Sequence, residues 1–281
     1  MFASLYLGYC ILLHAQIPHP KTLSNLNSNL IMKPTIAIYD FTDCEGCEVQ
    51  LISLLEDFLE IEKRVEIVNW RLGQEDNHQI QFDICIIEGT PITREEQKLL
   101  RSLRKRSKIL VALGACAALG GVPASVDQTQ RKKWLKKIYG AKYKSRGDSA
   151  KPLSNFVKVD AIIPGCPATK KDILRAITDL LDGKIPATQN FPVCKECKAN
   201  NNPCRLLNNQ PCLGPVSIGG CDAICVSGGA GCWGCRGLLE NGNLPAFRKT
   251  LEKFMTKQEI EQFMSVFLSN DLIINKPNTK T

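Results

Sequence analysis

The chain has 281 residues, enough for about two domains, and 44% of its residues are hydrophobic, so it can bury a sizeable core. Its formal charge of +8 would suit nucleic acid, but aromatic residues make up only 6% and do not interleave with the basic ones, so stacking surfaces are missing. Fourteen cysteines in a chain of this length are too sparse for a small disulfide scaffold, which makes metal binding their leading use.

The first 31 residues stand apart from the rest of the chain. They contain an apolar stretch that is too short to span a bilayer, without a basic n-region, a twin arginine or a small-residue cleavage site. We therefore expect neither a signal peptide nor membrane insertion. Residues 1–31 are predicted to be a disordered or mis-started extension in which Cys10 carries no chemistry.

From Met32 onward, short β-rich runs alternate with helical stretches. Helices are expected at about 47–60, 93–105, 129–139 and 168–182, and strands at 35–41, 64–70, 82–89, 108–114 and 159–165. This alternation predicts a flavodoxin-like α/β domain over residues 32–187, with helices on both faces of a parallel sheet. The predicted α/β domain contains no GxGxxG motif and no P-loop, so the carboxyl ends of its strands should bind something other than a nucleotide.

Four cysteines follow strands of this predicted sheet. Cys44 and Cys47, in "DFTDCEGCEVQ", follow the first strand, Cys116 follows the fourth and Cys166 the fifth, so all four should meet at one edge. Three loops that deliver four soft ligands to one place favour an iron-sulfur cluster. A four-cysteine zinc site usually comes as two paired knuckles instead. Cys85, in the middle of "FDICIIEG", is predicted to be a packed core thiol.

The composition changes after Pro186, and residues 188–281 are predicted to form a ferredoxin-like iron-sulfur domain with carboxyl-terminal helices. Eight cysteines are what two more four-thiolate clusters require, although two zinc sites stay open. Four disulfides would need a secreted protein, and no export signal is seen. The eight are Cys194, Cys197, Cys204, Cys212, Cys221, Cys225, Cys232 and Cys235.

The partition of these eight ligands has two solutions. Local grouping separates the first four from the last four, whereas in two-cluster ferredoxins the last cysteine of one run serves the other cluster, which would exchange Cys212 with Cys235. Beyond Pro245 no ligands remain. Two helices are predicted there, the second opened by a Thr256–Glu259 capping box, and their apolar side chains should pack on the iron-sulfur part or meet another subunit.

Five motifs together resemble the small subunit of cytosolic [NiFe] hydrogenases, near the sulfhydrogenase delta and F420-non-reducing types. They are "CEGCEVQL", "EGTPIT", "GACAALGG", "PGCP" and "CLGPVSIGGCDAIC" followed by "GCWGC", and the likeness covers about residues 33–245. The first half is shared with the 20 kDa quinone-reductase subunit of respiratory complex I. The complex I subunit has two adjacent cysteines at its first motif and lacks the eight later cysteines. These two differences favour a hydrogenase small subunit over a complex I subunit.

The resemblance implies an electron-transfer subunit with three [4Fe-4S] clusters. Cys44, Cys47, Cys116 and Cys166 would ligate the proximal cluster, facing a NiFe catalytic centre on a separate large subunit, and the eight later cysteines would hold the medial and distal clusters. A further implied partner is a flavin or iron-sulfur acceptor subunit of the diaphorase type. No nucleic-acid partner is expected. Periplasmic relatives use a distal histidine and a twin-arginine signal; His14, His19 and His78 lie outside the cysteine block, so a cytoplasmic protein is expected.

Two other functions compete with the hydrogenase. One is the related connecting subunit of a membrane-associated oxidoreductase, and the other is a zinc-stabilised interaction module without redox activity. The sequence does not identify the terminal electron acceptor, because that site would lie on another chain.

Overall fold

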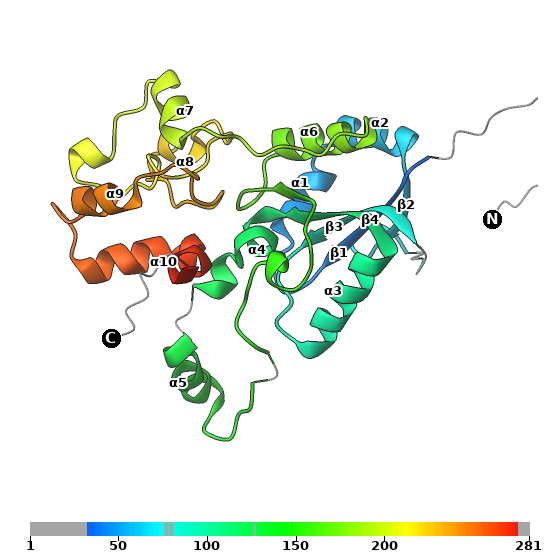
Figure 1. The fold of residues 1–281 in the computed structure, drawn as a ribbon, viewed down its shortest axis with the longest axis horizontal. Coiled ribbons are helices and arrows are strands. Elements are labelled where there is room, and N and C mark those ends of the chain that lie inside the picture. The colour runs from blue at the N-terminus through cyan, green and yellow to red at the C-terminus, as the bar shows by residue number, and fades with distance from the viewer. Residues whose placement is uncertain (1–32, 76–77, 79–80, 126–127, 146, 275–281) are drawn as a thin grey trace, which may run out of the picture. The chain divides into compact units, whose positions relative to one another are not determined.

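A computed structural model describes residues 33–274, apart from 76–77, 79–80, 126–127 and 146. The predicted extension at residues 1–31, with Cys10, lies outside the described residues. The described chain forms a five-stranded parallel sheet flanked by helices and followed by a cysteine-rich segment and two helices (Figure 1).

The sheet has the strand order β2-β1-β3-β4-β5, and every neighbouring pair is parallel. This is the flavodoxin-like order, so the predicted fold class is confirmed. Its strands are β1 (Thr35–Asp40), β2 (Glu66–Trp70), β3 (Phe82–Glu88), β4 (Ser107–Leu113) and β5 (Ala161–Ile163).

Side chains alternate between the two faces of this sheet, as the period of two in a strand requires. Ile36 and Ile38 point to one face with Ile84 and Ile86, whereas Cys85 belongs to the cluster on the other face. Cys85 is fully buried there, which confirms the prediction of a core thiol.

Helices cover both faces (Figure 1). Buried residues of α1 (Gly46–Ile52), α2 (Glu56–Arg64) and α6 (Lys170–Leu181) pack on the first face, and those of α3 (Arg94–Arg106) on the second. The helix expected at 47–60 is two helices, because Leu55 adopts a φ of 54° between them. Helix α3 begins with a Thr93–Glu96 capping box, which satisfies free N–H groups of its first turn.

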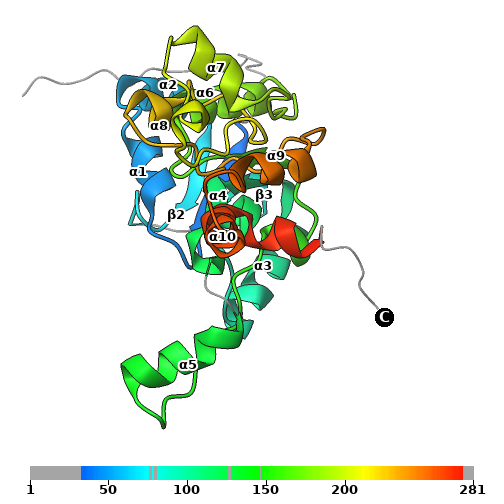
Figure 2. The same ribbon diagram turned by 90° about the vertical axis from the view of Figure 1, so that its left-hand side faces the viewer.

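Two helices between β4 and β5 differ in character. Helix α4 (Gly114–Leu119) directly follows β4, was not predicted, and carries Cys116. Helix α5 (Gln128–Tyr139) extends away from the sheet in both views (Figure 2) and exposes the basic side chains of Lys132 and Lys136. Short 3₁₀ turns lie at Val122–Ala124 and Leu153–Asn155.

The carboxyl-terminal part has its own apolar cluster. The short elements of the cysteine-rich segment are α7 (Val193–Ala199), a 3₁₀ turn at Leu206–Asn208 and α8 (Ile224–Ser227). Helices α9 (Leu244–Leu251) and α10 (Lys257–Ile274) follow, and Phe263, Met264 and Phe267 pack with Leu213 and Val216 of that segment. The expected packing of these helices on the cysteine-rich part is confirmed, as is the Thr256–Glu259 capping box.

Candidate functional site

The structure places the first four predicted ligands at the carboxyl-terminal edge of the sheet. Cys44 and Cys47 come after β1, Cys116 lies in α4 after β4, and Cys166 lies between β5 and α6. We call these four residues the sheet-edge group. They flank the point where the strand order reverses between β1 and β3, which is where open α/β sheets bind ligands.

Electrostatic coupling shows that the sheet-edge thiols are near one another. Burial, followed by the charges of Cys166, Asp43 and Cys44, raises the pKa of Cys116 to about 12. Burial likewise raises the pKa of Cys47, which the charge of Cys166 raises further. A raised pKa disfavours free thiolates at Cys47 and Cys116, whereas a coordinated metal removes the thiol proton outright.

Glycines leave free space beside these sulfurs. A Cβ atom at Gly114 would lie 2.4 Å from the Cys47 Sγ, and one at Gly121 would lie 2.8 Å from the Cys116 Sγ. Gly114 has a φ of +79°, which strains any other residue. The backbone N–H of Ala168 donates to the Cys47 sulfur at 3.4 Å, as N–H groups do around cluster thiolates.

A buried carboxylate that sequence reasoning missed holds the loop of Cys47. Glu88, at the end of β3, accepts from the backbone N–H groups of Cys47 (3.0 Å) and Glu48 (2.8 Å). Its signal in the sequence was a lone acidic residue directly after a run of buried apolar residues, within "EGTPIT". Glu88 thus fixes the first turn of α1, and with it the position of Cys47.

Two more buried carboxyls adjoin the sheet-edge group. Glu48 is only 1% exposed, and its carboxylate accepts a hydrogen bond from Trp70 Nε1 at 2.7 Å. It therefore does not face solvent, as a glutamate in the first turn of a helix usually does. Burial raises the pKa values of Asp43 and Glu48 to about 7 each. The Asp43 Oδ2 and Glu48 Oε1 atoms accept no hydrogen bond from the described residues.

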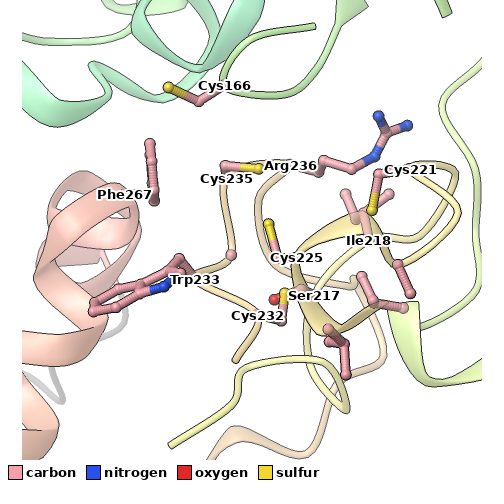
Figure 3. Close-up of a pocket in the computed structure, with 14 residues that line it drawn as sticks. Cys166, Ser217, Ile218, Cys221, Cys225, Cys232, Trp233, Cys235, Arg236 and Phe267 are labelled. Atoms are coloured by element: carbon pink, nitrogen blue, oxygen red, sulfur yellow. The ribbon is translucent and has the colours of Figure 1, made fainter. Parts of the chain in front are cut away.

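A cavity of about 180 Å³ is lined by the last four cysteines, and by Cys166 of the sheet-edge group. Figure 3 shows the sulfurs of these four cysteines around one space, with Trp233 and Phe267 on the side of α10. Burial raises the pKa values of two of these thiols, Cys232 and Cys235, to about 12. We call Cys221, Cys225, Cys232 and Cys235 the cavity group.

The remaining four cysteines form the α7 group: Cys194 and Cys197 lie in α7, and Cys204 and Cys212 follow it in the chain. Burial raises the pKa of Cys194 to about 11, and the charges of the other three members raise it further. A Cβ atom at Gly214 would lie 3.4 Å from both the Cys194 and the Cys212 sulfurs, so this glycine sits beside the space between them.

The three groups adjoin one another in a fixed order. Cys166 lines the same cavity as the four cysteines of the cavity group, which joins the sheet-edge group to the cavity group. The Cys232 backbone N–H donates to the Cys212 Sγ at 3.2 Å, which joins the cavity group to the α7 group. The cavity group therefore lies between the other two.

These twelve residues fit iron-sulfur clusters in their donor chemistry. All are free thiols, and each group combines soft sulfur donors with glycines or N–H groups close to the sulfur atoms. Within the described residues, no three metal-ligating side chains are close enough to share a single ion. In the same part of the chain, no helix is both long and apolar enough to cross a bilayer.

Comparison with known proteins agrees with this arrangement. Residues 44–180 match the family of the NADH ubiquinone oxidoreductase 20 Kd subunit. The chain is 34% identical to the sulfhydrogenase 2 subunit delta of Pyrococcus furiosus, over 83% of this chain and 98% of the relative. It is 30% identical to a subunit of the F420-non-reducing hydrogenase vhu of Methanocaldococcus jannaschii, over 72% of this chain and 81% of the relative.

A solved structure supports the fold. The Ni-Fe-Se hydrogenase from Desulfomicrobium baculatum, in a reduced, active form, aligns with a TM-score of 0.51 and 17% identity, over 80% of this chain and 100% of the aligned chain. The sheet-edge motifs are shared with the 20 Kd subunit family, whereas the relatives from Pyrococcus and Methanocaldococcus match over 234 and 233 residues, more than the sheet alone. The chain belongs to the hydrogenase small-subunit family, of the sulfhydrogenase delta and F420-non-reducing type, which is related to the 20 kDa subunit of complex I.

Proposed function

We propose that this chain is the electron-transfer small subunit of a [NiFe] hydrogenase. It would carry electrons through three [4Fe-4S] clusters, between a NiFe centre on a separate large subunit and a downstream acceptor subunit. The observation that supports this most strongly is the order of the three cysteine groups: Cys166 lines the cavity of the cavity group, and the Cys232 N–H donates to the Cys212 sulfur.

The sheet-edge group would hold the proximal cluster, the cavity group the medial cluster and the α7 group the distal cluster. When bound, such clusters supply one-electron transfer at potentials that the surrounding protein adjusts. The part of this chain is to hold and surround them. Its cysteines would ligate the clusters, and the N–H groups of Ala168 and Cys232 donate to the sulfurs of Cys47 and Cys212.

The domain boundaries predicted above remain part of this proposal. Residues 32–187 would form the domain of the proximal cluster, and residues 188–281 the domain of the other two with the carboxyl-terminal helices. The diaphorase-type acceptor subunit and the cytoplasmic location likewise stay predictions.

A second candidate is a connecting subunit of a quinone-reducing oxidoreductase, which the match to the 20 Kd subunit family favours. That match ends at residue 180 and so includes no member of the cavity or α7 groups. A subunit with only the sheet-edge cluster would not use those eight cysteines, and the hydrogenase function accounts for them.

The test is metal analysis of the protein purified without oxygen, together with its copurifying subunits. We expect about twelve iron atoms and about twelve sulfides per chain, EPR signals from the reduced clusters, and a nickel-containing large subunit in the complex. Stoichiometric zinc without iron would exclude electron transfer. A complex with quinone-binding subunits and no nickel would favour the second candidate.

A further inference from the structure

A buried ion pair lies between the cavity group and the sheet. The Arg236 Nη1 atom is 2.6 Å from Asp172 Oδ2, and the two side chains are only 2% and 5% exposed. Asp172 is held at the start of α6, where its Oδ2 also accepts from the Thr169 hydroxyl at 2.8 Å. Surface ion pairs contribute little, but a buried charge that loses its partner is costly, so these two side chains depend on each other.

The guanidinium also binds two backbone carbonyls, both close to cysteines. Arg236 Nε donates to the Gly219 carbonyl at 2.8 Å, and Nη1 donates to the Pro164 carbonyl at 3.2 Å. Gly219 precedes Cys221 by two residues, and Pro164 precedes Cys166 by two residues. Arg236 itself directly follows Cys235, so one side chain connects three segments that carry proposed ligands.

The space around this guanidinium is closed. A Cβ atom at Gly220 would lie 2.6 Å from Arg236 Nη2, so the loop before Cys221 passes directly over the side chain. Figure 3 shows the guanidinium on the side of the cavity next to Cys221. Arg236 lines the same cavity as Cys221, so its positive charge lies beside the cavity group.

We propose that the Arg236–Asp172 pair positions the cavity group and sets the reduction potential of the cluster bound there. This inference rests on the proposed function. It adds a pair of residues that position the cysteines but are not themselves ligands of the cluster. The guanidinium fixes the spacing of Cys166, Cys221 and Cys235 through the carbonyls of Pro164 and Gly219. The carboxylate cancels the positive charge that this anchor brings into the protein interior.

The two members of the pair should shift the potential in opposite directions. One-electron reduction adds one negative charge to a cluster, so a nearby positive charge favours reduction and a nearby negative charge opposes it. Loss of Arg236 leaves the buried Asp172 carboxylate with only the partly exposed Arg175, whose Nη2 is 3.4 Å from Asp172 Oδ1, and loss of Asp172 leaves the Arg236 guanidinium without its carboxylate partner. A role limited to packing would not reverse its sign between the two variants.

The experiment is a potentiometric titration of the iron-loaded complex, followed by EPR, on Arg236→Gln, Asp172→Asn and the double variant. We expect Arg236→Gln to lower the midpoint potential of the cavity-group cluster and Asp172→Asn to raise it. Each shift should be at least tenfold in the equilibrium between oxidised and reduced cluster, or about 59 mV for a one-electron couple. The double variant should return close to the unsubstituted protein, and the α7-group cluster should not shift.

Two controls make the test decisive. Arg104→Gln breaks another ion pair, with Asp160, which is anchored at β4 and β5 rather than at a cysteine segment, and it should leave all cluster potentials unchanged. Arg236→Lys keeps the charge and should keep the potential closer to the original than Arg236→Gln does. If Arg236→Gln does not retain its clusters, the sign of the shift in Asp172→Asn decides alone.

The outcomes separate this inference from the function on which it rests. Absence of iron in the unsubstituted protein would contradict the proposed function itself. With all clusters present, equal potentials in the two single variants, or shifts of the same sign, would overturn the role of the pair. Opposite shifts that cancel in the double variant would establish it.

Discussion

The backbone N–H of Cys232 donates to the sulfur of Cys212 at 3.2 Å. These residues are twenty positions apart in the chain and belong to different cysteine groups, so this hydrogen bond is where the cavity group meets the α7 group. Cys235 lines the cavity together with Cys221 and Cys225, and a Cβ atom at Gly214 would lie 3.4 Å from the sulfurs of both Cys194 and Cys212. The structure therefore favours local grouping over an exchange of Cys212 with Cys235.

Cys212→Ser tests this partition. A hard hydroxyl in place of a soft thiolate should degrade the α7-group cluster and leave the cavity-group cluster in place, with a loss of up to about four iron atoms per chain. Cys235→Ser should do the reverse. Iron analysis and EPR of the reduced variants measure both effects. The exchanged partition predicts the opposite assignment of the lost signal.

Cys47→Ser should remove or degrade the sheet-edge cluster while the two other clusters remain, because their eight ligands come from a separate segment. Hydrogen-dependent reduction of an acceptor should then collapse in the assembled complex. Cys85→Ser is the control, since that thiol is buried in the core and joins no group; it should cost about 1–3 kcal/mol of stability and keep all clusters. Full iron content with full activity in Cys47→Ser would contradict the assignment.

Gly114→Ala should impair the sheet-edge cluster for a steric reason. The new Cβ would lie 2.4 Å from the Cys47 sulfur, and Gly114 has a φ of +79°. Gly183 is a matched control, because its φ is +74° but an added Cβ meets nothing within 4 Å. Both variants should lose about 1 kcal/mol from backbone strain, but only Gly114→Ala should lose iron. Equal iron content in the two variants would show that the space beside Cys47 is not needed.

Asp160 should contribute stability that depends on pH. Burial alone would raise its pKa, but the Leu110 N–H and the Arg104 guanidinium outweigh burial and hold the pKa below its ordinary value. A carboxyl whose pKa is lowered by folding stabilises the protein above its unfolded pKa, and this stabilisation disappears as the pH falls through the folded pKa. Asp160→Asn should therefore unfold at lower urea concentration at pH 7.

The gap in urea midpoint between Asp160→Asn and the unsubstituted protein should shrink below about pH 4, where the carboxyl of the unfolded chain becomes protonated. A urea series from pH 7 to pH 3, run identically on both proteins, measures it. A gap that stays constant over this range would show that the ion pair does not stabilise the fold electrostatically.

Thr256→Ala should weaken the start of α10. The Thr256 hydroxyl accepts from the Glu259 N–H at 3.3 Å, and the Glu259 side chain accepts from the Thr256 N–H at 2.7 Å. Loss of the hydroxyl should cost about 1 kcal/mol in the free energy of unfolding, measured by urea denaturation. Thr256→Ser keeps the acceptor and should cost less; equal losses in both would assign the effect to packing.

Local pattern was sufficient for much of this protein. Short β-rich runs such as "TIAIYDF" predicted all five strands, because β-branched and aromatic side chains favour a strand. The order of strands and helices then predicted a parallel sheet, and the cysteines that follow its strands had to meet at one edge. Cys85 was predicted to be a core thiol because it lies in the middle of the run "FDICIIEG".

Other features depended on contacts between distant segments. Glu88 orients Cys47 across 41 positions, Asp172 meets Arg236 across 64, and Cys166 lines one cavity with Cys235. None of these pairs has a spacing or period that a sequence pattern could reveal. Helix α4 and the break at Leu55 were also missed, because neither has a local signal stronger than its neighbours. Residue types and strand order thus determined which chemistry this chain can hold, whereas tertiary packing decided which cysteines adjoin and which charge lies beside them.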